Sequence, residues 1–126
     1  MKILQGIDLV KIDRVEKDIL KGGKRFLDRI FSPGEQAYCR DKRMSYEHYA
    51  ARFAAKEAVL KALKVRPKKG RRLAGIEVGR EASGKPFITF DGVSRKEFRI
   101  PARAQIELSI AHEREYAIAT VVIVVP

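Results

Sequence analysis

Three charged side chains stand in patterns that would serve phosphate chemistry if the fold brought them together. Asp8 lies inside the apolar run Gly6–Val10, and Glu57 and Lys61 lie four residues apart in an alanine-rich stretch. An inward-facing Asp8 needs a partner, because an unpaired buried carboxylate is costly. Two carboxylates from separate segments would make a sparse magnesium site, since magnesium also takes waters and substrate phosphates. A neighbouring lysine would neutralise phosphate charge.

Each candidate residue also has an ordinary explanation, and the pattern alone leaves both open. Strand alternation allows Asp8 to point to solvent, opposite its apolar neighbours. Glu57 and Lys61 share a helix face, where an exposed pair contributes only about 0.3 kcal/mol. His112 ends a predicted strand before a charged turn, and His48 has no motif around it. Such histidines are usually exposed, and His48 is predicted to be a surface helix residue.

The charge balance favours an acidic or polyanionic partner. The chain has 27 Lys and Arg against 16 Asp and Glu, for a net charge of +11, and such a field attracts anionic partners. One basic group lies in or after the first predicted helix: Arg14, Lys17, Lys21, Lys24 and Arg25. A second group lies in a loop: Lys64, Arg66, Lys68, Lys69, Arg71 and Arg72. A basic nucleic-acid-binding module is the alternative function, but it leaves Asp8 unexplained.

Length and composition predict one compact cytoplasmic domain, residues 1–126. Hydrophobic residues make up 45% and charged residues 34%, which is typical of a soluble globular chain. The single cysteine, Cys39, fits a reducing compartment. The N-terminus shows no signal-peptide pattern, and the longest apolar run, Val121–Val125, is too short to span a bilayer. There is no Walker loop, Rossmann fingerprint, zinc spacing or nucleophile elbow.

The first third of the chain predicts a strand followed by helical segments. Ile3–Ile12 is rich in strand-forming residues. Asp13 and Glu16 have capping-box spacing and predict a helix start. Gly22-Gly23 should break that helix, and Lys24–Phe31 should form another short helical turn.

Two further helices are expected before the middle of the chain. Ser32-Pro33-Gly34-Glu35 combines an N-cap serine, a proline at the first position and a capping-box glutamate. Ser45 is predicted to cap the longest helix, which runs to about Leu63. Its alanine-rich centre favours helix and allows neighbouring backbones to approach closely.

The second half predicts a basic loop and two β-hairpins. The loop covers Lys64–Arg72, the first hairpin pairs Gly75–Val78 with Phe87–Phe90, and the second pairs Ile106–Ile110 with Tyr116–Val125. Helices in the N-terminal half and antiparallel strands afterwards indicate an α+β domain. The helices are expected to pack on an antiparallel sheet.

Four segments in order along the chain carry a family pattern. They are Gly6-Ile7-Asp8-Leu9-Val10, Phe31-Ser32-Pro33-Gly34-Glu35, Arg52–Ala58 with Lys61-Ala62-Leu63, and Leu108–His112 followed by Tyr116-Ala117. Together they resemble the motifs of the holo-acyl-carrier-protein synthases, which are phosphopantetheinyl transferases. The resemblance covers the whole chain, its helix segment is highly specific, and it implies the 4′-phosphopantetheinyl transferase fold.

The resemblance implies a reaction and a set of roles. The reaction is magnesium-dependent transfer of 4′-phosphopantetheine from coenzyme A to a serine of apo acyl carrier protein, releasing adenosine 3′,5′-bisphosphate, a step of fatty acid biosynthesis. Homotrimers with active sites at subunit interfaces are implied; membrane and nucleic-acid partners are not expected. The implied roles are Asp8 and Glu57 for magnesium, Glu57 and Lys61 for catalysis, Arg52, Lys61 and His112 for coenzyme A, and Arg14, Lys17, Lys21 and Arg25 for carrier docking.

The general base is assigned only as a preference. Glu57, directly or through a water on the metal, is the first candidate, and Glu35 is the second. Two positions depart from the family pattern: Lys64-Val65-Arg66-Pro67 stands where a glycine-containing loop is usual, and Ala111 stands where serine usually precedes the histidine.

Overall fold

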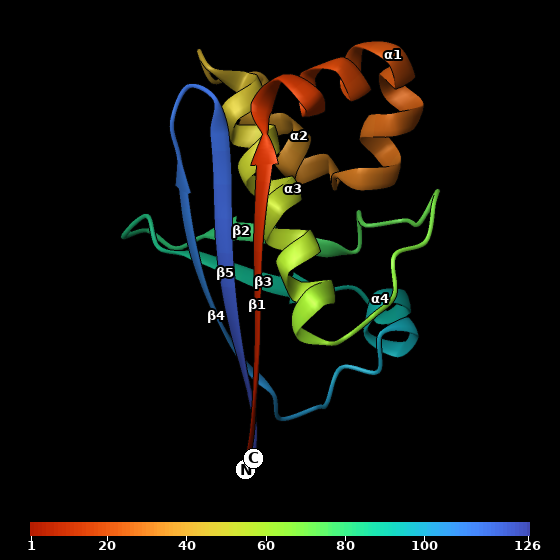
Figure 1. Ribbon diagram of the computed structural model, residues 1–126, viewed down its shortest axis with the longest axis vertical. Coiled ribbons are helices and arrows are strands. Elements are labelled where there is room, and N and C mark those ends of the chain that lie inside the picture. Colours follow the sequence, from red (N-terminus) through yellow and green to blue (C-terminus); the bar gives the residue numbers. More distant parts are fainter.

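The computed structural model describes residues 1–126. The elements are β1 (Lys2–Lys11), α1 (Ile12–Ile30), α2 (Pro33–Arg40), α3 (Ser45–Ala62), β2 (Ile76–Arg80), β3 (Pro86–Phe90), α4 (Gly92–Glu97), β4 (Gln105–His112) and β5 (Tyr116–Val125). Figure 1 shows α3 lying along the strands β1 and β5, α1 and α2 at their upper end, and both chain termini at the lower end. The predicted α+β class is confirmed.

The five strands divide between two antiparallel sheets. The first has the order β1-β5-β4, and the second is the β2-β3 hairpin, which runs across the direction of the first sheet (Figure 1). Both predicted hairpins are confirmed, and α3 packs on the first antiparallel sheet through β1 and β5, as predicted. In the first sheet Asp8 lies opposite Ala119, and His112 lies opposite Ala117. The sheet therefore carries both residues near the end at which α1 begins.

Helix α3 is the centre of the core. Eleven of its residues are buried, most of them alanines, so β1 and β5 on one side and α1 and α2 on the other can approach closely. Gly6 marks the tightest approach, because a Cβ built there would lie 2.0 Å from the carbonyl oxygen of Ala58 and 2.7 Å from the nitrogen of Ala62. A glycine in a strand interior often marks such a backbone contact. Gly6 thereby sets the distance between α3 and the strand that carries Asp8.

Replacing Gly6 by alanine should destabilise the protein by about 3 kcal/mol or more, because the new methyl group meets backbone atoms that cannot move independently. Urea denaturation of Gly6→Ala and of Gly92→Ala would measure this. Gly92 is the matched control, since a Cβ there meets nothing within 4 Å. A loss below about 1 kcal/mol for Gly6→Ala would show that β1 and α3 separate easily.

Of the three helix N-caps that the sequence predicts, the structure has the one at Ser32 and lacks those at Asp13 and Ser45. The Ser32 capping box is present, with both of its reciprocal hydrogen bonds, and Gly23 interrupts α1 with φ of 59°. The predicted Asp13 cap is wrong: α1 begins at Ile12, whose amide donates to the carbonyl oxygen of Glu115 at 2.9 Å. Ser45 is the first residue of α3 and makes no cap. None of the helices combines the length and the apolar character that a membrane crossing needs.

Candidate active site

Asp8, Glu57 and Lys61 form one group, the carboxylate–lysine cluster. Asp8 points from β1 toward α3, where its Oδ1 accepts a hydrogen bond from the Lys61 Nζ at 2.9 Å. The Asp8 side chain is 14% exposed and that of Lys61 is 57% exposed. Of the two orientations that alternation allowed for Asp8, the structure therefore has the one that faces the helix.

Glu57 is the electrostatically unusual member of this cluster. Burial raises the pKa of its carboxyl, and the negative charge of Asp8 raises the pKa further. Three cations partly offset the rise, namely Lys61, Arg71 and Arg14. Glu57 also lines a cavity of about 340 Å³ between α1, α3 and the loop that follows α3. A poorly solvated carboxylate at a cavity wall is a candidate for proton transfer or cation binding.

The donor set of this cluster fits magnesium. No group of three or more His, Cys, Asp or Glu side chains is placed to hold a metal ion, so a closed zinc-type site, which needs three or four protein ligands, does not fit. Magnesium is commonly held by one or two carboxylates plus waters and substrate phosphates. A cation there would also relieve the repulsion that raises the pKa of Glu57. Asp8 and Glu57 are the residues that would hold it.

Arg52 and His112 belong to a separate group around the start of α3, the arginine–histidine cluster. Arg52 is 3% exposed; its Nη1 donates to the carbonyl oxygen of His48 at 3.3 Å, and its Cζ lies 4.2 Å from the centroid of the Tyr38 ring. The His112 Nδ1 lies 2.9 Å from Oε1 of Glu47. The Arg52 Nε is buried without a hydrogen-bond partner. No hydrogen bond or ion pair joins this cluster to the carboxylate–lysine cluster.

The structure corrects the prediction for His48 and adds His48 and Glu47 to this cluster. His48 is not an exposed surface residue, because its ring packs between those of Tyr38 and His112. Burial lowers the pKa of His48, and the nearby His112 and Arg52 lower the pKa further. The four-residue spacing of His48 and Arg52 was a visible signal of a shared helix face. Glu47 and His112 are 65 residues apart, so no local pattern could pair them.

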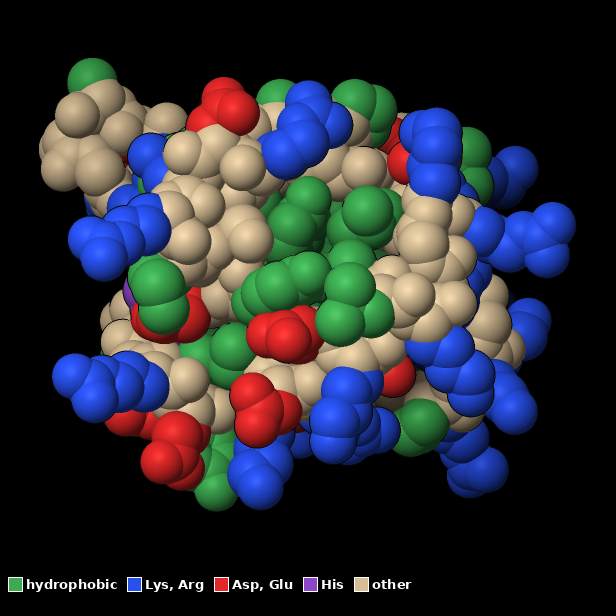
Figure 2. Space-filling model, turned by 90° about the horizontal axis from the view of Figure 1, so that it is seen from above, with side chains coloured by type: hydrophobic (Ala, Val, Ile, Leu, Met, Phe, Trp, Pro, Cys, Tyr) green, Lys and Arg blue, Asp and Glu red, His purple; other side chains and the backbone are tan.

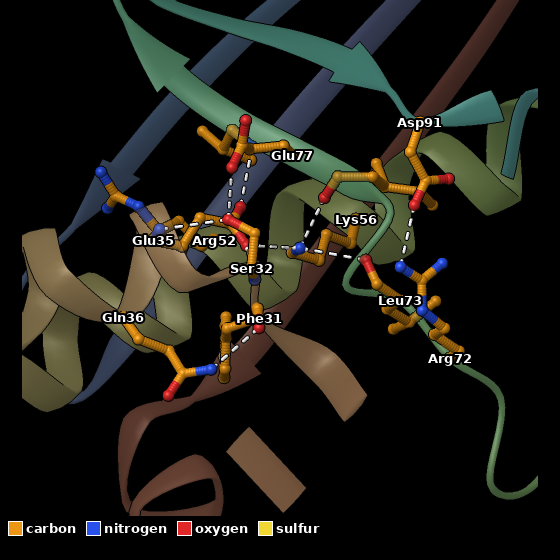
Figure 3. A network of polar contacts seen from close by, with 12 residues as sticks. Phe31, Ser32, Glu35, Gln36, Arg52, Lys56, Arg72, Leu73, Glu77 and Asp91 are labelled. Carbon is orange, nitrogen blue, oxygen red and sulfur yellow. Dashed lines mark hydrogen bonds and ion pairs between the residues drawn. The ribbon is translucent and has the colours of Figure 1, made fainter. Parts of the chain in front are cut away.

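Glu35, the second candidate base, is part of a buried structural network (Figure 3). Its Oε1 accepts from the Lys56 Nζ at 2.7 Å and from the amide of Ser32 at 2.8 Å, and its Oε2 accepts from the amide of Val78 at 2.7 Å. The Glu35 and Lys56 side chains are both 0% exposed. Since both carboxylate oxygens are occupied and no solvent reaches them, Glu35 is not placed to receive a substrate proton.

The four basic residues assigned to carrier docking all lie on the surface of α1. Arg14, Lys17, Lys21 and Arg25 are exposed, and no ion pair neutralises them. Viewed from above, Lys and Arg side chains crowd the right-hand edge of the molecule, the side on which α1 lies in Figure 1 (Figure 2). This edge offers a cationic surface next to the cavity that Glu57 lines.

Comparison with known proteins places the chain in a family. Residues 5–121 match the family model of the 4′-phosphopantetheinyl transferase superfamily. The holo-[acyl-carrier-protein] synthases of Koribacter versatilis and Thermodesulfovibrio yellowstonii are 39% and 41% identical to this chain over 118 residues, covering 94% of it and 94% and 95% of theirs. The crystal structure of the Helicobacter pylori holo-[acyl-carrier-protein] synthase in complex with coenzyme A superposes with a TM-score of 0.79 at 35% identity, covering 96% of this chain and 100% of that one. The chain therefore belongs to the 4′-phosphopantetheinyl transferase superfamily, among its holo-[acyl-carrier-protein] synthases.

Proposed function

We propose that this enzyme transfers the 4′-phosphopantetheine group of coenzyme A to a serine of an apo acyl carrier protein, using magnesium and releasing adenosine 3′,5′-bisphosphate. The names of its relatives and the coenzyme A bound by the H. pylori structure support the substrates. The observation that carries the proposal is the meeting of Asp8, Glu57 and Lys61 beside a cavity with a cationic rim.

In this mechanism the serine oxygen attacks the β-phosphorus of coenzyme A, and the bond from that phosphorus to the pyrophosphate bridging oxygen breaks. Adenosine 3′,5′-bisphosphate leaves with the bridging oxygen. Glu57 accepts the serine proton, and its raised pKa brings it nearer the range suited to a general base. Lys61 binds the phosphate oxygens, so the protein contributes mainly positioning and charge stabilisation. Magnesium, when bound by Asp8 and Glu57, supplies neutralisation of phosphate charge.

Intact-mass analysis of an apo acyl carrier protein incubated with the enzyme, coenzyme A and magnesium tests the proposal. The carrier should gain the mass of one phosphopantetheine group, and EDTA should prevent the gain. A gain that persists in EDTA would reject the magnesium requirement, and no gain with several carriers would reject the proposed reaction. Salt-sensitive binding of generic RNA would then favour the nucleic-acid alternative.

Charge reversal at Arg14 should weaken carrier recognition selectively. Arg14→Glu should raise the KM for the carrier by about tenfold, because a rim charge then repels the acidic partner, while the KM for coenzyme A changes little. Arg103→Glu is the control for the effect of net charge on long-range attraction. It makes the same charge change at an exposed residue outside the docking set. Equal effects of the two variants would argue against docking on α1.

We also propose that the enzyme is a homotrimer whose subunits meet through the outer face of the β1-β5-β4 sheet. This face is apolar yet uncovered: Ile3, Ile7 and Leu9 are 62%, 53% and 60% exposed. An apolar strand face of this kind marks a protein interface more often than free surface. Assembly also offers a way to bring the arginine–histidine cluster of one subunit toward the carboxylate–lysine cluster of another.

Placing a charge on this face should break the assembly. Ile7→Arg should shift the mass measured by multi-angle light scattering from trimer to monomer, because the interface cannot solvate a buried guanidinium. Val93→Arg is the control, since Val93 is 66% exposed on α4 and far from the sheet face. A trimer that survives Ile7→Arg would show that subunits meet elsewhere.

A further inference from the structure

We propose that the basic loop 64–72 is a second wall of the carrier-docking surface, facing α1 across the cavity that Glu57 lines. The partner is the acidic acyl carrier protein, so this inference rests on the proposed function and extends it. The first-helix residues would then hold one side of the carrier and the tip of the loop, Lys68 and Lys69, would hold the other.

The cavity brings cations of α1 and cations of the basic loop into the lining of one opening. Five cations line it: Arg14 and Arg29 from α1, and Lys68, Lys69 and Arg71 from the loop. Only two acidic side chains, Asp18 and Glu57, are present in the same lining, and the remaining side chains are largely apolar. An acidic protein surface with a few apolar residues complements such an opening in both charge and polarity.

Two of these five cations, Arg29 and Arg71, brace the loop, whereas the two loop lysines, Lys68 and Lys69, make no such contact. The Nη1 of Arg29 donates to the carbonyl oxygen of Arg71 at 3.3 Å, and the Nη1 of Arg71 donates to that of Arg66 at 2.7 Å. The amide of Arg71 donates to the carbonyl oxygen of Lys68 at 3.3 Å, which closes a turn. Lys68 and Lys69 are exposed on this turn and form no ion pair. The loop thus presents two unpaired ammonium groups from a supported backbone.

The position of Glu57 favours a carrier over coenzyme A as the occupant of this cavity. Lys61, which would bind the phosphates, and Asp8, which would hold magnesium, are not among the residues that line it. Glu57 is shared by the carboxylate–lysine cluster and the lining of the cavity. Phosphoryl transfer needs the attacking and leaving oxygens roughly in line, on opposite sides of the phosphorus. The serine of the carrier is therefore expected to arrive from the cavity, between α1 and the loop.

Carrier binding and kinetics of the double variant Lys68→Glu/Lys69→Glu test the inference. Calorimetry with an apo acyl carrier protein, without coenzyme A, should show affinity lowered about tenfold. The KM for the carrier should rise to a similar extent, and the KM for coenzyme A should stay within about twofold. Lys96→Glu/Arg103→Glu is the matched control, because it makes the same change in net charge at exposed residues that do not line the cavity.

Three outcomes of the variant comparison would overturn the inference. Equal weakening by the two double variants would mean that only the overall field attracts the carrier. A raised KM for coenzyme A alone would make the loop part of the coenzyme A site. Unchanged carrier affinity would remove the loop from docking altogether. Wild-type enzyme that binds the carrier but transfers nothing would count against the proposed reaction, while the binding comparison would still decide the role of the loop.

Discussion

Replacing Asp8 by asparagine should lower kcat by about a hundredfold to a thousandfold, the loss expected when one preorganised electrostatic contact at a reacting phosphate is removed. Asparagine keeps the shape of Asp8 but removes the charge that Lys61 pairs with and that a magnesium ion would need. Glu57→Gln should have a comparable effect, since it removes the other carboxylate and the candidate base. Both variants should be assayed at saturating coenzyme A and carrier over a range of magnesium concentrations.

This prediction has two controls, namely a substitution at a remote carboxylate and a measurement of the stability of Asp8→Asn. Asp41→Asn removes an exposed carboxylate at the end of α2 and should leave kcat unchanged. The free energy of unfolding of Asp8→Asn should stay within about 1 kcal/mol of wild type, because a partly exposed ion pair contributes little. Near-normal turnover of Asp8→Asn at ordinary magnesium concentration would remove Asp8 from the metal site.

Replacing Lys56 by methionine should lower the free energy of unfolding by about 3–5 kcal/mol, the usual cost of removing one partner of a buried ion pair. The Glu35 carboxylate would remain fully buried without its counter-ion, and the carbonyl oxygens of Leu73 and Ile76 would lose their donor. A domain of this size has a total stability of only about 5–15 kcal/mol. Urea denaturation followed by circular dichroism measures the difference.

Two further variants separate the ion pair from other effects of this substitution. Lys24→Met removes a helix-surface pair with Asp28, whose side chains are 85% and 50% exposed, and should cost less than about 0.5 kcal/mol. Glu35→Gln/Lys56→Met should recover part of the loss, because no uncompensated charge then remains buried. A cost of less than about 1 kcal/mol for Lys56→Met would show that the network contributes little to stability.

The features that sequence predicted well depend on residues close together in the chain. The Ser32 capping box and the break at Gly22-Gly23 involve contacts within a few residues, and each hairpin joins strands that follow one another directly along the chain. The short α4 was missed although its signal was present, since Asp91 caps the helix by accepting from the amide of Ser94. The start of α1 was misplaced for a different reason. A hydrogen bond from Ile12 to Glu115, at the far end of the chain, holds that residue.

By itself the sequence determined the types, order and spacing of the residues that carry the chemistry, and these suffice for the resemblance to a transferase family. Only the tertiary structure decided which of them meet. Both faces of β1 are apolar, so alternation could not say whether Asp8 or its neighbours Ile7 and Leu9 would face α3. The absence of a Cβ at Gly6 lets α3 pack on the Asp8 face. The packing of α2 on α3 likewise buries Lys56 against Glu35, and no pattern within either segment indicates that pair.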